Sequence, residues 1–150
     1  MLKALIATAP FADKNRIPLK LLEKANIDYL INPLNKKLTE DELADMVSDF
    51  DVIIAGTEPI TKKVMDAATN LKMISRVGIG LDSVDLLEAE KRGIVVSYTP
   101  DAPAPAVAEL TIGLKLMGTV PFYLKTTYYF PYFFLTKFKV QIYTIYQKTK

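Results

Sequence analysis

Short apolar runs alternate with segments of helical periodicity along the first 117 residues, and this alternation constrains the fold more than any other feature. The runs expected to form strands are residues 2–9, 28–32, 51–56, 71–78 and 94–97. The segments expected to form helices are residues 18–25, 39–47, a stretch that begins at Thr61, 86–92 and 105–117. Five strand–helix repeats with short links predict an α/β fold, in which helices cover both faces of a doubly wound, mostly parallel five-stranded sheet.

Capping residues mark where several of these helices begin and end. Thr39 is followed three residues later by Glu42, and Asp85 by Glu88. Each pair predicts a capping box, which occupies two backbone N–H groups at the start of a helix. Gly93 is expected to end the helix 86–92, because glycine adopts a positive φ angle without a steric penalty.

Composition excludes several kinds of chemistry. The 150 residues are enough for one domain with a hydrophobic core. They include no cysteine and no histidine, which excludes disulfides, thiolate chemistry and the commonest general acid–base side chain. Residues 1–117 carry 17 acidic and 14 basic side chains, which gives no support for a nucleic-acid partner. The sequence shows no metal-ligating constellation, and we expect no metal site.

Residues 118–150 differ in composition from the rest of the chain. They hold 11 of the 15 aromatic residues and five lysines, with no acidic residue. Lysines and prolines interrupt the apolar runs, so the roughly 20 apolar residues of a membrane helix are missing. We interpret this stretch as an irregular or non-native tail, and hypothesise that a shifted reading frame through A/T-rich DNA produced it. An exposed β-tail and a genuine interaction segment are the alternatives.

The stretch RVGIGLDSVD, residues 76–85, is the candidate functional motif. As a dinucleotide-binding loop it is incomplete, because Ser83 takes the third glycine position and the motif follows the fourth strand. A tight structural turn would explain Gly78 and Gly80, but not the exposure of their backbone N–H groups. Open α/β sheets bind ligands at the carboxyl edge, where this loop would lie. The motif therefore predicts a site for a small anion such as a carboxylate.

Three segments, NLKMISRVGIGLDSVD, KRGIVVSYTP and VAELTIGL, resemble the substrate-binding domain of the D-isomer-specific 2-hydroxyacid dehydrogenases, most closely the phosphoglycerate-dehydrogenase-like branch. The resemblance covers residues 1–117. It implies a flavodoxin-like substrate domain, a separate NAD-binding domain, and hydride transfer between NAD and a D-2-hydroxyacid. It also implies that Ile79 and Gly80 present N–H groups to the substrate carboxylate, with Gly78 and Ser83 as the other substrate-binding positions.

The same resemblance implies what residues 1–117 lack. In the family, VAELTIGL begins a helix that enters the NAD domain, and that domain carries the cofactor loop and the catalytic Arg, Glu and His. We therefore assign no catalytic and no cofactor-binding residue to this chain. We expect a truncated enzyme, with a boundary after Met117, that does not bind NAD by itself and is inactive alone.

Two charged residues bear on the substrate. Glu58 lies where relatives that use phosphorylated substrates often place an Arg, which weakens phosphoglycerate as the parent substrate. Arg76 could attract a carboxylate or pair with a surface acid. We expect the partner to be a small 2-hydroxy or 2-oxo acid, 3-phosphoglycerate-like acids included, and the parent enzyme to be a cytoplasmic homodimer. The alternative function is a freestanding flavodoxin-like module that binds a small carboxylic acid.

Overall fold

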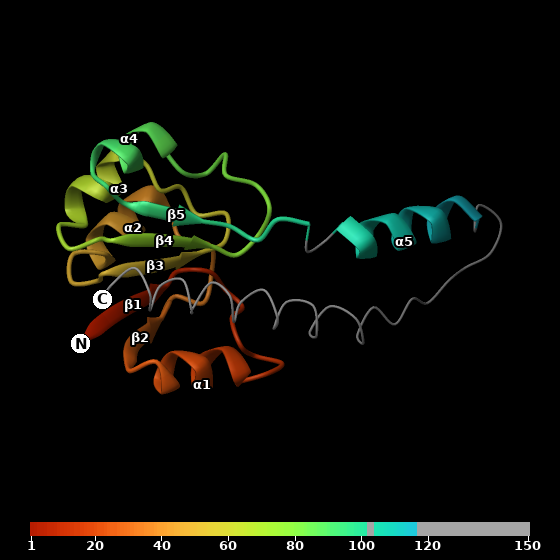
Figure 1. The fold of residues 1–150 in the computed structure, drawn as a ribbon, viewed down its shortest axis with the longest axis horizontal. Coiled ribbons are helices and arrows are strands. Elements are labelled where there is room, and N and C mark those ends of the chain that lie inside the picture. Colours follow the sequence, from red (N-terminus) through yellow and green to blue (C-terminus); the bar gives the residue numbers. More distant parts are fainter. Residues whose placement is uncertain (102–103, 117–150) are drawn as a thin grey trace.

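Strands and helices alternate along the whole of the computed structural model, which describes residues 1–101 and 104–116 (Figure 1). The elements are β1 (Leu2–Ile6), α1 (Ile17–Lys24), β2 (Ile27–Ile31), α2 (Glu40–Met46), β3 (Val52–Ala55), α3 (Lys62–Ala67), β4 (Met73–Arg76), α4 (Leu86–Lys91), β5 (Val95–Ser97) and α5 (Ala104–Leu116). The strands form one sheet in the order β2-β1-β3-β4-β5, and every neighbouring pair is parallel. The predicted α/β class and parallel five-stranded sheet are thus confirmed.

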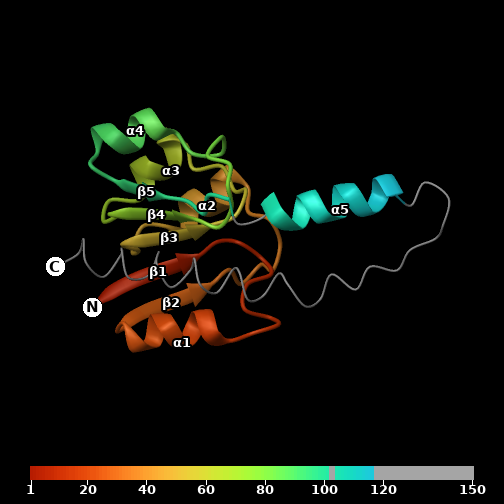
Figure 2. The ribbon, with the colours of Figure 1, turned by 45° about the vertical axis from the view of Figure 1, so that its right-hand side comes forward.

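The two faces of the sheet carry separate hydrophobic cores. Successive side chains of a strand point to opposite faces, so Leu5 and Ile53 join one core while Ile6 and Ile54 join the other. Helices α2, α3 and α4 cover the first face, and α1 covers the second (Figures 1 and 2). All four of these strand side chains are fully buried.

Most strands are shorter than the apolar runs that predicted them. β1 ends at Ile6 rather than at residue 9, and β4 covers Met73–Arg76 rather than residues 71–78. Each ends where the partner strand ends, because ladder bonds need two strands. The predicted boundary after Met117 and the tail, residues 118–150, lie outside the described residues.

One of the two predicted capping boxes forms and the other does not. At α2, the Thr39 side chain accepts from the Glu42 N–H, and the Glu42 carboxylate accepts from the Thr39 N–H. At α4, Asp85 accepts from the Glu88 N–H, but the reciprocal bond is missing, and the prediction there is wrong. The Glu88 carboxylate bonds Arg92 instead, and the Asp85 N–H donates to the carbonyl of Ile60.

Helix α5 stands apart from the sheet in both ribbon views (Figures 1 and 2). Several of its large apolar side chains are exposed, including Val107, Ile112 and Leu114 at 58%, 59% and 64%. Among the helices of residues 1–101 and 104–116, none is long and apolar enough to cross a membrane.

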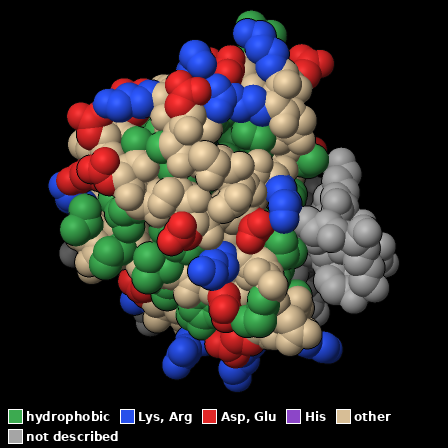
Figure 3. All heavy atoms as spheres, turned by 90° about the vertical axis from the view of Figure 1, so that its left-hand side faces the viewer, with side chains coloured by type: hydrophobic (Ala, Val, Ile, Leu, Met, Phe, Trp, Pro, Cys, Tyr) green, Lys and Arg blue, Asp and Glu red, His purple; other side chains and the backbone are tan. Residues whose placement is uncertain are grey.

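Asp51 joins the strands at the amino edge of the sheet, on the side opposite the candidate site. Its carboxylate accepts from the Lys3 N–H at 2.9 Å and from the Lys72 ammonium at 2.8 Å, and its backbone bonds both residues as well. Asp51 precedes β3, so it links the starts of β1, β3 and β4. On this face of the molecule, acidic and basic side chains are interspersed (Figure 3).

Candidate functional site

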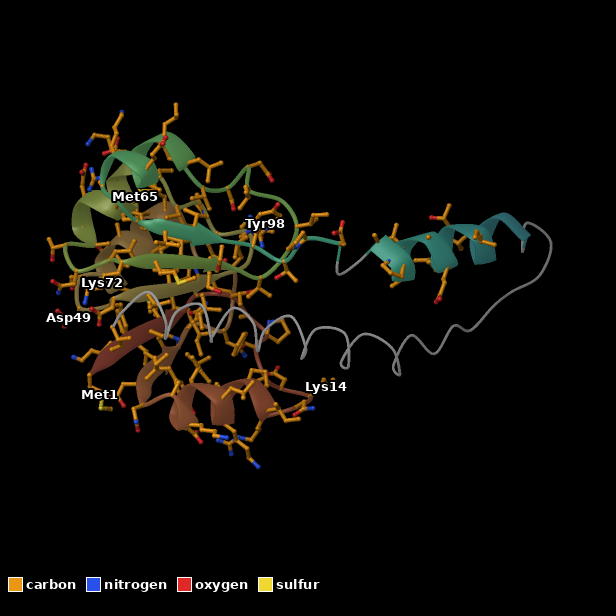
Figure 4. All side chains as sticks on the ribbon, viewed as in Figure 1. Met1, Lys14, Asp49, Met65, Lys72 and Tyr98 are labelled. Atoms are coloured by element: carbon orange, nitrogen blue, oxygen red, sulfur yellow. The ribbon has the colours of Figure 1, made fainter. Side chains whose placement is uncertain are left out.

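The candidate motif lies at the carboxyl edge of the sheet, as predicted. It forms the loop that follows β4 and leads into α4. Tyr98, directly after β5, marks this edge, and Lys72, directly before β4, marks the opposite one (Figure 4). The loop is therefore at the edge where parallel α/β sheets hold their ligands.

Both ends of the loop are fastened to neighbouring segments. The Val77 N–H donates to the Ala55 carbonyl at 2.7 Å, and the Thr99 N–H donates to the Gly78 carbonyl at 2.9 Å. Further along, the Ile60 N–H donates to the Ser83 carbonyl at 2.7 Å. The end of β3 and the segments after β3 and β5 thus bond the start and the end of the loop and leave its middle uncovered.

The N–H groups of Ile79 and Gly80 make no hydrogen bond within the described part of the chain. The preceding N–H, that of Gly78, is occupied, because it donates to the Arg76 carbonyl at 3.1 Å. The Ile79 side chain is 52% exposed, so solvent reaches the loop here. Two successive unbonded N–H groups at an accessible turn make a surface of the kind on which proteins bind small anions.

Arg76 lies directly beneath this surface. Its side chain is buried, with 6% exposed, and its Nη1 donates to the Val77 carbonyl at 2.7 Å. A Cβ atom built on Gly78 would lie 2.7 Å from that Nη1, so the guanidinium packs against the glycine. Gly78 also has a φ angle of +151°, which residues with a side chain rarely adopt. The φ angle favours glycine here, and a larger residue would also displace the end of the Arg76 side chain.

A carboxylate also lies close to the loop. A Cβ built on Gly80 would be 2.6 Å from the Asp82 Oδ1. Asp82 is exposed, so water screens its charge more than that of the buried Arg76. The local field at the loop therefore combines a buried positive group with a screened negative one.

Ser83 is placed differently from the other predicted residues. Its hydroxyl is buried and has no hydrogen-bond partner among the residues that the structure describes. A contact between this hydroxyl and a substrate stays a prediction, whereas Gly78, Ile79 and Gly80 lie together at the surface.

Glu58 is buried beside the same edge, with 2% exposed. Its Oε2 accepts from the Gly56 N–H at 2.6 Å. Thr8, which follows β1, lies against the same glycine, since a Cβ there would be 2.5 Å from its Oγ1. The Glu58 side chain thus bonds the backbone that follows β3 and places an acidic group at the carboxyl edge.

Sequence reasoning missed Thr99. It is buried, with 5% exposed; its N–H bonds Gly78 and its hydroxyl donates to the Arg76 carbonyl at 3.4 Å. The sequence YTP after a strand contains no pattern that predicts these bonds, because Thr99 reaches Gly78 and Arg76 only when β5 pairs with β4. Only the sheet order could have revealed it.

The loop of residues 76–85 does not fit the pyrophosphate of a dinucleotide such as NAD. A dinucleotide's pyrophosphate needs a free helix N-terminus, but the Asp85 carboxylate already caps α4, a helix of six residues. Asp82 would repel the pyrophosphate as well. Among residues 1–101 and 104–116, no group of three or more acidic side chains could hold a metal ion either.

A family model described as the catalytic domain of the D-isomer specific 2-hydroxyacid dehydrogenases matches residues 10–145. The chain belongs to this family. Hydroxypyruvate reductase of Thermotoga maritima is 42% identical over 83 residues, which are 55% of this chain and 27% of that protein. D-3-phosphoglycerate dehydrogenase of Methanocaldococcus jannaschii is 43% identical over 81 residues, 53% of this chain and 15% of that protein.

The solved structures agree with the sequence relatives. The 3-phosphoglycerate dehydrogenase of Entamoeba histolytica, crystallised with NAD+, matches with a TM-score of 0.66 and 30% identity. The match covers 78% of this chain and 39% of that one. The chain thus spans less than half the length of these relatives.

Proposed function

We propose that this chain is the substrate-binding domain of an NAD-dependent D-2-hydroxyacid dehydrogenase, and that the N–H groups of Ile79 and Gly80 bind the substrate carboxylate. The observation that carries the proposal is the pair of unbonded N–H groups, in the described part of the chain, between fastened loop ends. Backbone N–H groups presented in succession attract an anion without a charged side chain in contact.

In this proposal the chain orients the substrate and does not transfer the hydride. Holding the carboxylate leaves the adjacent 2-carbon available for reaction. NAD supplies the hydride chemistry in the family, and its site lies elsewhere in the parent enzyme. The chain contains no histidine to exchange the proton of the substrate hydroxyl.

We also propose an unphosphorylated parent substrate. The buried Glu58 carboxylate at the carboxyl edge supports this, because like charges repel more strongly away from water. The exposed apolar side chains of α5 support packing against the rest of the parent enzyme, which we propose to be a cytoplasmic homodimer.

A titration of the isotope-labelled chain with pyruvate, followed by amide chemical shifts, tests the carboxylate site. We expect saturable shifts at Ile79 and Gly80 with pyruvate, weaker ones with 3-phosphoglycerate, and none with methyl pyruvate, which lacks the carboxylate. Ile79→Ala keeps both N–H groups and should bind pyruvate as the wild type does. Shifts confined to other residues would refute the site.

An assay of NADH oxidation tests the second part of the proposal. The purified chain should oxidise no NADH with pyruvate, glyoxylate or hydroxypyruvate. Turnover by the chain alone would contradict the assignment of hydride transfer to another part of the parent.

A further inference from the structure

We propose that Arg76 is a positioning residue that fixes the direction of the Ile79 N–H and thereby sets the affinity of the loop for a carboxylate. The inference rests on the proposed function, because it concerns the same two N–H groups. In this inference the buried, charged Arg76 side chain acts by contacting the backbone of the loop and does not contact the ligand.

Arg76 holds one peptide group from both ends. The Val77 carbonyl and the Gly78 N–H belong to the same peptide plane and point in opposite directions. The Arg76 guanidinium donates to that carbonyl at 2.7 Å, and the Arg76 carbonyl accepts from that N–H at 3.1 Å. The plane cannot rotate without breaking both bonds.

The next peptide group is held from the opposite side. The Gly78 carbonyl accepts from the Thr99 N–H at 2.9 Å. Since the carbonyl and N–H of a trans peptide are opposed, this bond directs the Ile79 N–H away from Thr99. The Thr99 hydroxyl also donates to the Arg76 carbonyl, so the two fastenings are connected. The first unbonded N–H of the loop thus has a fixed direction before a ligand arrives.

The buried guanidinium contributes charge as well as geometry. It packs against the Cα of Gly78, because a Cβ there would lie 2.7 Å from Nη1 and 3.3 Å from Cζ. A positive group one residue from the unbonded N–H attracts an anion and offsets the nearby Asp82. Fixed dipoles bind an ion without reorganising at the moment of binding.

Pyruvate titrations of Arg76→Met test this role. Losing a hydrogen bond from a charged group should weaken pyruvate binding about tenfold. Amide hydrogen exchange should rise at Ile79 and Gly80 while the sheet keeps its protection. Added guanidinium ion should restore part of the affinity by filling the vacated space, which a general loss of stability would not allow.

Three further variants keep the test decisive. Arg92→Met removes the same charge at the far end of α4 and should leave binding unchanged. Thr99→Val keeps the N–H and loses only a 3.4 Å hydroxyl bond, so affinity should fall less than about threefold. Arg76→Lys keeps the positive charge but not the planar guanidinium. Its affinity for pyruvate should lie between those of the wild type and Arg76→Met.

Each outcome bears on one proposal. The positioning role is overturned if pyruvate shifts the wild-type amides and Arg76→Met binds pyruvate with an affinity within twofold of the wild type. The proposed function stays intact in that case. If Arg76→Met does not fold, Arg76→Lys decides, and wild-type affinity in that variant overturns the inference. Absence of pyruvate shifts in the wild type overturns the proposed function itself, and the positioning role with it.

Discussion

Replacing Asp51 by alanine should destabilise the chain without affecting the candidate site. Asp51 lies at the amino edge of the sheet, with its side chain 16% exposed, and joins the starts of β1, β3 and β4. The loop after β4 lies at the other edge. The variant therefore separates the stability of the sheet from the properties of the loop.

The expected loss follows from the two bonds of the Asp51 carboxylate. The bond from the Lys3 N–H to a charged acceptor contributes about 1.5–3 kcal/mol, and alanine leaves that N–H without its acceptor. The Lys72 side chain is 58% exposed, so its pairing adds only about 0.2–1 kcal/mol. We expect the free energy of unfolding to fall by about 2–3 kcal/mol at neutral pH.

The pH dependence gives the prediction a second, independent form. Burial by itself raises the pKa of Asp51, but the bonds from Lys72 and the Lys3 N–H lower it more, and the net pKa lies below its usual value of 3.8. A carboxyl whose pKa is depressed by folding stabilises the fold above the unfolded pKa. That contribution is lost as the pH falls through the lower, folded-state pKa.

Urea unfolding followed by circular dichroism, repeated from pH 7 down to pH 2, measures both effects. The difference between wild type and Asp51→Ala should be largest at neutral pH and shrink below about pH 4. Asp49→Ala removes the same charge from an exposed neighbour near this edge and should cost less than about 0.5 kcal/mol (Figure 4). A cost below 0.5 kcal/mol for Asp51→Ala, or one unchanged by acid, would refute the reasoning.

Three more predictions concern the loop, a helix cap and the core. Gly78→Ala should cost about 2 kcal/mol or more in urea unfolding, because φ is +151° and the new Cβ meets the guanidinium, whereas Gly93→Ala, at φ +67° in open space, should cost about 1 kcal/mol. The pKa of Glu42 should be about 2 by NMR titration, since the Lys36 ammonium and the Thr39 N–H hydrogen-bond its carboxylate, and Lys36→Met should raise it. Ile53→Ala should cost about 3 kcal/mol by urea unfolding, since its side chain is fully buried.

The periodicity of the sequence was enough to predict the class of fold. Runs such as DVIIAG need cover on both faces, and only parallel strands between helices provide it. Strand ends were not predictable to the residue, because pairing with a neighbour sets them. The capping box at Thr39 forms, whereas the Glu88 carboxylate bonds Arg92 instead of completing a box with Asp85. The spacing of Asp85 and Glu88 could not predict this competing bond.

The candidate loop was predictable in place and only partly in content. Two glycines after an apolar run predicted a loop at the carboxyl edge, and the structure leaves its Ile79 and Gly80 N–H groups unbonded in the part it describes. That these groups bind an anion stays a prediction. The environment of Arg76 could not be predicted from the sequence, because its side chain turns inward to Val77 rather than outward to the surface. The direction of a side chain at the end of a strand depends on the residues that pack around it.

The strand order also has a consequence for biosynthesis. β1 pairs with β2 and β3, and β4 and β5 are then added one after the other along a single edge. All residues that form the strand pairs are therefore available once Ser97 has emerged from the ribosome, and the Thr99 N–H that bonds Gly78 follows two residues later. The sheet and its loop can assemble on the ribosome in the order in which they are made, before helix α5 emerges.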